Sequence, residues 1–319
     1  MPIASFLVRH ARLLLAVSLF IGIALPPLAA LLRPVLAGSV AALLFLAMLR
    51  VGWRGLIEHV RRPAVVALGL LWLLAGRALL MWAAVAPLRL PPGIEDALVL
   101  MAAAPPIMSA PALAPLLGLD AGLSLVLVSL ATLLAPLTVP SAAAWLAGAA
   151  LEIDLSAFTL RIALIIFGSV GAAVVVRTAL GEARVARAAP IVDAASVLLL
   201  LSFAVAIMDG IGPLLLMRPF FVAAMIAGSY VANLGLQAVG AAVFARLGRS
   251  PALTLGFLGG NCNMAVLLAA LPPTADRDTL LWFALAQFPI FTLPALLARP
   301  YRWLLSPESS GGMRSRTPS

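Results

Sequence analysis

Long apolar runs, separated by short stretches that contain arginine, dominate the 319-residue chain. Hydrophobic residues make up 64% of the sequence and charged residues 10%, and the mean hydropathy is +1.14. Inside a lipid bilayer every backbone polar group must be satisfied within the protein, so apolar runs of this length form spanning helices. The sequence therefore predicts an all-α polytopic membrane protein and excludes a soluble fold.

The charged residues carry information about topology. The net charge of +9 comes from arginines that lie one to four at a time between the apolar runs. This placement is typical of topology signals, so no nucleic-acid partner is expected. The single Cys262 excludes an internal disulfide and a cysteine-based metal cluster. His10 and His59 flank the runs, without a His-Glu metal motif or a mid-span Ser-His pair. We therefore expect neither a bound cofactor nor an enzyme.

The apolar runs predict ten spanning helices. In order they cover about 13–32, 36–48, 63–86, 93–117, 123–147, 160–176, 190–208, 219–244, 251–271 and 279–297. Fifteen arginines then fall on the side of the two termini and five on the other side, which predicts that both termini lie in the cytoplasm. Residues 304–319 are polar and are predicted to form a disordered cytoplasmic tail.

Two of the ten helices are predicted to be interrupted. The ninth contains Gly-Gly-Asn-Cys-Asn-Met at 259–264, and its flanks, 251–258 and 265–271, are each too short to cross a bilayer. The fourth contains Pro105 and Pro106, which lack backbone donors. Unpaired backbone groups at membrane depth are tolerated only inside protein or beside a water-filled cavity, as at the binding sites of secondary transporters. The alternative is a glycine-kinked helix packed against its neighbours.

The ten helices divide into two repeats of five, 1–150 and 151–303, and the interrupted helix is the fourth in each. Ser109 lies 29 residues before the Thr-Val-Pro sequence at 138–140, and Asn263 lies 29 residues before the Thr-Leu-Pro sequence at 292–294. Because five is odd, the repeats would have opposite orientations in the membrane. Inverted repeats with paired broken helices are the construction that alternating access uses.

Three motifs lead to a family. They are Ser-Leu-Ala-Thr-Leu-Leu-Ala-Pro at 129–136, Asn-Met-Ala-Val-Leu-Leu-Ala at 263–269, and Arg62-Pro63 followed by Gly69. On these motifs the chain resembles the bile acid:sodium symporter family, and in particular the bacterial homologues of the apical sodium-dependent bile acid transporter. The resemblance implies a core of helices 3–5 and 8–10, which carries substrate and ions, and a panel of helices 1, 2, 6 and 7. It also implies that helices 4 and 9 cross at the site.

The chain departs from the family at its sodium positions. Leu258 and Cys262 stand where the family has a Glu and a Gln, Ala110-Pro111 replaces a Ser-Asn pair, and Leu73 replaces a Gln. Thr132 is the one sodium-site position that remains. Coupling to two sodium ions is therefore disfavoured, and Na⁺ as the coupling ion, proton coupling and uncoupled transport all stay open.

The candidate site residues are polar groups at or near the two breaks. Asn261 and Asn263 supply both donors and carbonyl acceptors. The predicted substrate-binding set is Asn261, Asn263, Ser109, Pro111, Arg77 and Gln287, and the predicted ion-binding set is Thr132, Ser129 and Asn261. The alternative for the asparagines is interhelical hydrogen bonding, and for Ser129 and Thr132 a bond to their own helix. Ser229, Asn233 and Gln237 share one helix face and are expected to join it to its neighbours.

Arg77 is a charged residue at predicted bilayer depth. Such a side chain costs at least about 2.5 kcal/mol and usually faces a cavity or a partner. Two interpretations remain open: Arg77 attracts an organic carboxylate, or it snorkels toward the outer interface. A neutralising side chain would come from a helix end, at Asp209, Glu95 or Asp96.

These observations, together with the resemblance, predict a secondary transporter for a small amphipathic organic anion, monomeric and embedded in the lipid bilayer of the bacterial inner membrane. The alternative from a different class is a membrane protein that binds a ligand without translocating it, such as a sensor.

Overall fold

The computed structural model describes residues 2–51, 63–146, 154–272 and 274–306. Every regular element within these ranges is a helix, which confirms the all-α prediction. The first half contains α1 (Pro2–Ala24), α2 (Pro26–Leu32), α3 (Leu36–Arg50), α5 (Pro63–Leu71), α6 (Arg77–Val85), α7 (Pro92–Ala103), α8 (Ala110–Leu117) and α9 (Ala121–Leu146). Short helical turns extend them: η1 (Arg33–Val35) joins α2 to α3, the π-helical η2 (Trp72–Gly76) joins α5 to α6, and η3 (Ala86–Leu88) follows α6.

The second half continues in the same way. It contains α10 (Leu155–Leu180), α11 (Glu182–Arg187), α12 (Ala189–Ala206), α13 (Ile211–Met217), α14 (Pro219–Val243), α15 (Arg249–Gly260), α16 (Met264–Ala270), α17 (Arg277–Leu285), α18 (Gln287–Leu296) and α19 (Ala298–Leu305), with the turn η4 (Ala245–Leu247) after α14. The carboxylate of Asp154 caps α10 by accepting hydrogen bonds from Ser156 and from the Ala157 N–H, and these bonds lower the pKa of Asp154.

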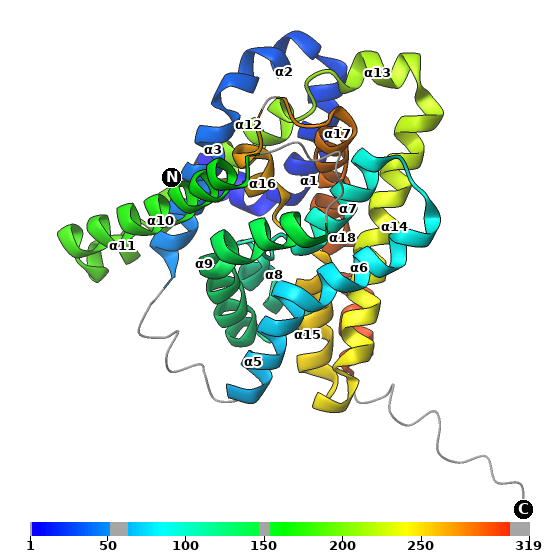
Figure 1. Cartoon of the computed structure of the whole chain (residues 1–319). Helices are drawn as coiled ribbons and strands as arrows, with labels where there is room; N and C mark the ends of the chain where they lie inside the picture. Colours follow the sequence, from blue (N-terminus) through cyan, green and yellow to red (C-terminus); the bar gives the residue numbers. More distant parts are fainter. Residues whose placement is uncertain (1, 52–62, 147–153, 273, 307–319) are drawn as a thin grey trace, which may run out of the picture.

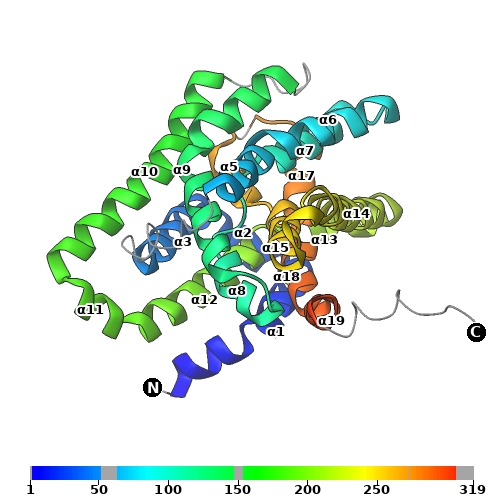
Figure 2. The ribbon, with the colours of Figure 1, turned by 90° about the horizontal axis from the view of Figure 1, so that it is seen from below.

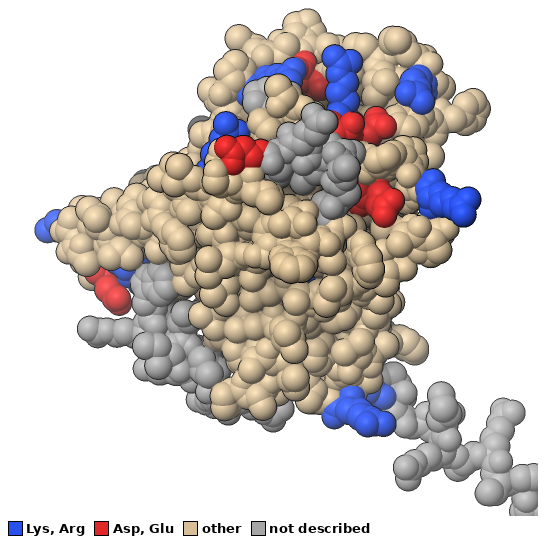
Figure 3. Space-filling view, in the orientation of Figure 1, with Lys and Arg blue, Asp and Glu red and all other residues tan. Residues whose placement is uncertain are grey.

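Seven helical stretches of the described chain are long and apolar enough to cross a membrane. They are Pro26–Arg50, Pro63–Leu88, Ala121–Leu146, Leu155–Leu180, Ala189–Met217, Pro219–Val243 and Arg277–Leu296. On the face shown in Figure 3, charged side chains gather over the upper part, at the left margin and at the lower end, and a broad uncharged area lies between them. An area of this kind suits the hydrocarbon region of a bilayer. The count of ten spans, the inverted repeat and the position of the termini stay predictions.

The prediction of one continuous first span over 13–32 is wrong. α1 ends at Ala24, and α2 begins at Pro26 and runs through η1 into α3 as a single candidate span. Pro26 and Pro27 fit the first turn of a helix, where a missing N–H costs nothing, and they cannot continue the helix before them. The second span therefore starts ten residues earlier than the predicted 36–48.

Two segments outside the predicted spans contain helical residues. The polar stretch after the sixth predicted helix contains a short helix, α11, and the first two residues of the predicted tail, Leu304 and Leu305, belong to α19. The rest of the tail from 307 on lies outside the described residues.

The helices form two groups that meet along one side of each (Figures 1 and 2). One group contains α1, α2, α3, α10 and α12, which pack on one another, and the other contains α5 to α9 and α14 to α18. Seen from below, α10, α11 and α12 lie to the left, α6, α14 and α15 to the right, and α8 and α9 between them (Figure 2). Contacts of α10 with α9, of α3 with α16 and of α1 with α18 join the groups.

Candidate functional site

The two predicted interruptions exist, and they pair with each other through their backbones. α7 ends at Ala103 and α8 begins at Ala110, while α15 ends at Gly260 and α16 begins at Met264. The N–H of Ile107 donates to the carbonyl of Asn261 over 2.8 Å, and the N–H of Asn263 donates to the carbonyl of Pro105 over 2.7 Å. These bonds form an antiparallel bridge between Pro106 and Cys262. We call residues 104–109 and 261–263 the crossing. Its pairing satisfies backbone groups that the breaks would otherwise leave unpaired inside the membrane.

Arg77 lies behind the crossing and is fully buried. Its Nε donates to the Leu73 carbonyl over 2.9 Å. Its Nη1 donates to the Gly259 carbonyl over 2.9 Å and to Cys262 Sγ over 2.9 Å, and its Nη2 donates to the Ala104 carbonyl. The guanidinium therefore lies inside the protein and contacts both breaks.

This position contradicts the snorkelling interpretation, because a snorkelling side chain would reach the interface. The partners of the guanidinium in the described chain are carbonyls and a thiol, whereas a carboxylate from a helix end was expected. One of the proposed partners, Asp209, instead pairs with Arg33 over 2.9 Å.

The amides of α14 also contact the break in α15. Asn233 Nδ2 donates to the Gly260 carbonyl over 2.8 Å, and Gln237 Nε2 donates to Asn233 Oδ1 over 2.6 Å. Tyr301 in α19 donates its hydroxyl to Gln237 Oε1 over 2.6 Å. The Asn233–Gly260 and Tyr301–Gln237 bonds are interhelical, as the sequence analysis expected for Asn233 and Gln237, whereas the Gln237–Asn233 bond lies within α14.

A cavity of about 430 Å³ lies on the other side of the crossing. We call it the central cavity. It is enclosed by α3 and α12 from one helix group and by the crossing, α8, α9, α16 and α18 from the other, and most of its lining is apolar. Five candidate residues line it: Ser109, Pro111, Ser129, Asn263 and Gln287.

The other three candidates are buried outside this lining. Asn261 donates its Nδ2 to the Phe257 carbonyl over 2.8 Å, and Thr132 donates its hydroxyl to Met108 Sδ over 3.3 Å. Arg77 is separated from the cavity by the crossing that it contacts. The structure thus brings five of the eight candidates together around one space and places three in the packing behind it.

Ser129 has an unusual environment. It is fully buried on α9 and lines the central cavity, and its hydroxyl has no hydrogen-bond partner among the described residues. Buried polar groups are almost always paired, so an unpaired hydroxyl on a residue that lines a cavity makes this residue a candidate for ligand contact. Asn261 Oδ1 is likewise unpaired within the described chain, but it does not line the cavity.

The sequence comparison agrees with this architecture. The model of the Sodium Bile acid symporter family matches residues 37–218, which is more than half of the chain. The chain belongs to this family. No curated protein matches it. The match runs from α3 to α13, so it contains the first break and both helices that wall the cavity on one side. As a member of the sodium bile acid symporter family, the protein is a multi-pass membrane protein of a transporter class.

The family name raises the question of whether the crossing fits a sodium ion. In transporters with broken helices, unwound carbonyls and the C-terminal ends of half-helices coordinate the ion. Here the Ala104 and Gly259 carbonyls accept from Arg77, and the Gly260 carbonyl accepts from Asn233. The protein's own side chains use these oxygens, so they do not fit a sodium site.

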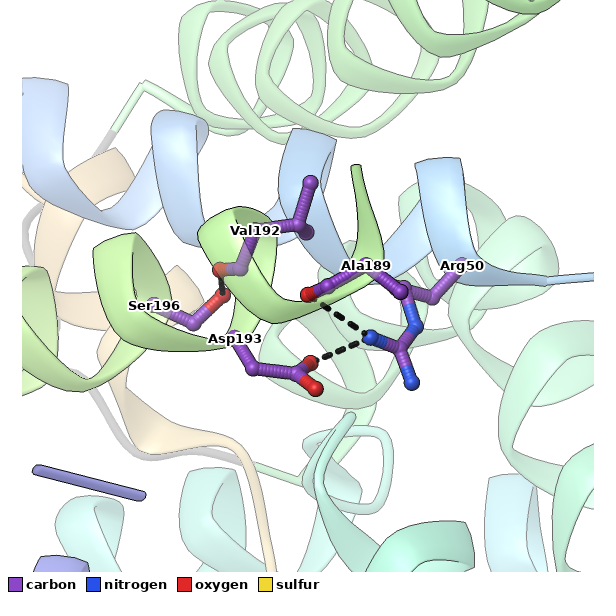
Figure 4. A network of polar contacts seen from close by, with 5 residues as sticks. All are labelled: Arg50, Ala189, Val192, Asp193 and Ser196. Atoms are coloured by element: carbon purple, nitrogen blue, oxygen red, sulfur yellow. Dashed lines mark hydrogen bonds and ion pairs between the residues drawn. The ribbon is translucent and has the colours of Figure 1, made fainter. Parts of the chain in front are cut away.

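In this member of the sodium bile acid symporter family, one end of the central cavity is lined by an ion pair that the sequence analysis missed (Figure 4). Arg50 at the end of α3 donates to Asp193 Oδ1 in α12 over 2.5 Å and to the Ala189 carbonyl over 3.2 Å. The two side chains are 43% and 41% exposed, so this end reaches solvent. Arg50 lies just beyond the second predicted helix, 36–48, and the available signal was an acidic residue, Asp193, inside the seventh predicted helix.

Proposed function

We propose that the protein carries a small amphipathic organic anion across the membrane and that the central cavity is its substrate site. The observation that carries this proposal is the cavity itself, with about 430 Å³ of space between the two helix groups. Small-molecule sites have volumes of about 300–1,000 Å³ and mostly apolar linings with a few placed polar groups. Ser129, Asn263 and Gln287 are such groups on an otherwise apolar wall.

The charges around the cavity favour an anion. The first residues of α8, including Pro111 and Ala112, line the cavity, and the N-terminal end of a helix favours negative charge. At the solvent end, Arg50 is held by Asp193. A substrate carboxylate can replace Asp193 as the partner of Arg50 on entry, because both offer the same charge-assisted hydrogen bonds. The apolar part of the substrate then contacts α3 and α12.

Transport follows from the position of the cavity between two groups of helices. Displacement of α3 and α12 relative to α8, α9 and α18 would close the Arg50 end and open the opposite end. With the termini in the cytoplasm, as the arginine distribution predicts, the Arg50 end is cytoplasmic and this conformation faces inward. The substrate site would then be reached alternately from the two sides.

The test is saturable uptake of organic acids into liposomes that contain the purified protein. In the variant Ala112→Trp an indole fills the cavity from α8, and we expect uptake to fall at least tenfold. Leu116→Trp is the matched control, because Leu116 lies on the same helix, is 48% exposed and does not line the cavity. It should transport as the unmodified protein does.

Two outcomes would contradict the proposal. Equal uptake by both tryptophan variants would mean that the substrate site lies elsewhere. Saturable binding to the unmodified protein without any flux would favour a non-translocating membrane binder of the same fold.

A further inference from the structure

The crossing brings two negative helix ends together. α7 and α15 both end there, and the last carbonyls of a helix carry a partial negative charge because no further N–H groups reach them. Ala104 is the C-terminal cap of α7, and Gly259 is the last residue but one of α15. Within a membrane protein, two such ends require a positive partner or several donors.

Arg77 supplies that positive partner from a third helix. One guanidinium donates to the Ala104 and Gly259 carbonyls, and thus to the ends of both half-helices. The guanidinium is planar and always charged, and its donors are fixed in direction, so a single side chain can hold two carbonyls at once. Its burial is complete, which leaves the carbonyl dipoles to balance its charge.

The local backbone fixes where the guanidinium lies. η2 is one π-helical turn, and it ends with the N–H of Arg77 bonded to the Trp72 carbonyl, five residues back. The Nε of Arg77 bonds to the Leu73 carbonyl, which an ordinary α-helix would pair with the Arg77 N–H. Backbone and side chain of Arg77 are therefore both tied to the same turn, and the guanidinium points toward the crossing.

The neighbouring carbonyls are used as well. Asn233 donates to the Gly260 carbonyl, and Asn261 donates to the Phe257 carbonyl. Cys262, at the centre of the bridge, contacts Arg77 through its sulfur. Side-chain donors thus occupy the Phe257, Gly259 and Gly260 carbonyls at the end of α15, and Asn261 Oδ1 is the side-chain oxygen there that has no partner in the described chain.

We propose that Arg77 is a fixed cation at the crossing, in the position where a broken-helix transporter binds a dissociable metal ion, so that the protein functions without sodium. A tethered charge keeps the two half-helices together but cannot leave to either side of the membrane. A sodium gradient therefore has no ion to move through this position. The part of this inference that concerns transport rests on the proposed function, whereas the part that concerns the crossing does not.

The test compares thermal unfolding of the purified full-length protein under different cations. In the unmodified protein, replacing choline by sodium at constant ionic strength should leave Tm unchanged. Arg77→Ala should lower Tm by roughly 5–10 °C, because it leaves buried carbonyl ends without their donors. Low concentrations of free guanidinium should restore part of this loss, while the same concentrations of urea should not.

Arg161→Ala is the control for loss of an arginine as such. Arg161 donates to one carbonyl, that of Ala270, from the exposed side of α10, so free guanidinium should not raise the Tm of that variant. A role for Arg77 in packing alone would give no difference between guanidinium and urea, and this result would overturn the proposal. If Arg77→Ala does not fold, Arg77→Lys is used in its place. Independently of either variant, a Tm of the unmodified protein that rises when sodium replaces choline would overturn the proposal.

A transport measurement distinguishes a failure of this inference from a failure of the proposed function. Uptake into liposomes should proceed at the same rate with external sodium as with choline. Uptake that requires sodium would overturn the fixed-cation proposal and leave the transporter proposal in place. If no acid in the panel is transported, the unfolding measurements still decide whether Arg77 replaces a metal cation, because they need no substrate.

Discussion

At the scale of single residues, two serines on α9 show how a cavity changes the role of a buried hydroxyl. Ser124 and Ser129 are both fully buried, but Ser124 donates to the Asp120 carbonyl over 2.7 Å, whereas the Ser129 hydroxyl has no partner in the described chain. A buried unpaired polar group costs about 1–3 kcal/mol. The unpaired Ser129 hydroxyl therefore destabilises the protein, and under the proposed function a bound substrate would supply its missing partner.

We therefore expect opposite effects from two alanine substitutions. Ser129→Ala should leave the free energy of unfolding unchanged or raise it by up to about 1 kcal/mol, and should weaken substrate binding about tenfold. Ser124→Ala should lower the free energy of unfolding by about 0.5–1.5 kcal/mol and leave affinity unchanged. Isothermal titration with a transported acid and thermal unfolding would measure both. Unchanged affinity in Ser129→Ala would remove this residue from the substrate site.

At the scale of helices, a line of hydrogen bonds joins α19 to the break in α15 through α14. Tyr301 donates to Gln237, Gln237 donates to Asn233, and Asn233 donates to the Gly260 carbonyl. Each donor points toward the break, so the bonds polarise one another in the same direction. The end of α15 is thus held by a side chain from a helix that lies beyond the last candidate span.

Removing the first donor of this line should destabilise the protein more than removing a comparable hydroxyl. Tyr301→Phe leaves Gln237 Oε1 buried and unpaired, so we expect the free energy of unfolding to fall by about 1–3 kcal/mol. In the control Tyr230→Phe, the lost partner is Thr292, which still donates to the Phe288 carbonyl, and the loss should stay below about 1 kcal/mol. Equal losses in thermal unfolding would mean that Gln237 finds another partner.

The helix breaks were predictable, but what holds them was not. Adjacent prolines at 105 and 106 and the Gly-Gly-Asn sequence at 259–261 have strong local effects on backbone, so both interruptions could be located. The partners of Arg77 could not, because they are carbonyl groups, which every residue has, and they belong to segments far apart in the chain.

The sequence analysis missed the helix boundary at Pro26 and the cavity wall on α3 and α12 because both lie in mostly apolar sequence. The apolar run over 13–32 contains no charge, so its hydropathy concealed the helix boundary at Pro26. Apart from Arg50, Asp193 and Ser196, the cavity wall on α3 and α12 is apolar and looks like any lipid-facing surface in sequence. Only the packing of α3 and α12 against the crossing distinguishes the residues that line the cavity from those that face lipid.

At the scale of the whole molecule, the distribution of arginines sets the orientation that the transport mechanism assumes. Fifteen arginines on the side of the termini against five on the other predict a cytoplasmic C-terminus. The Arg50 end of the central cavity then faces the cytoplasm.

Reporter fusions would check this orientation. A fluorescent protein that matures only in the cytoplasm should fluoresce when fused after residue 319. When fused after a truncation at residue 90, between the third and fourth predicted helices, it should stay dark. Fluorescence in the reverse pattern would place the Arg50 end outside the cell, and the conformation described above would then face outward.

The bridge between Pro106 and Cys262 uses only main-chain atoms. Its two hydrogen bonds therefore do not depend on which side chains flank them. Ser109, Asn263 and their neighbours on the cavity wall can be exchanged during evolution while the scaffold that presents them stays intact. The same property makes this protein a suitable starting point for engineering. A combinatorial library restricted to the cavity wall would sample new cargo preferences on a fixed frame, and most of its members should still fold.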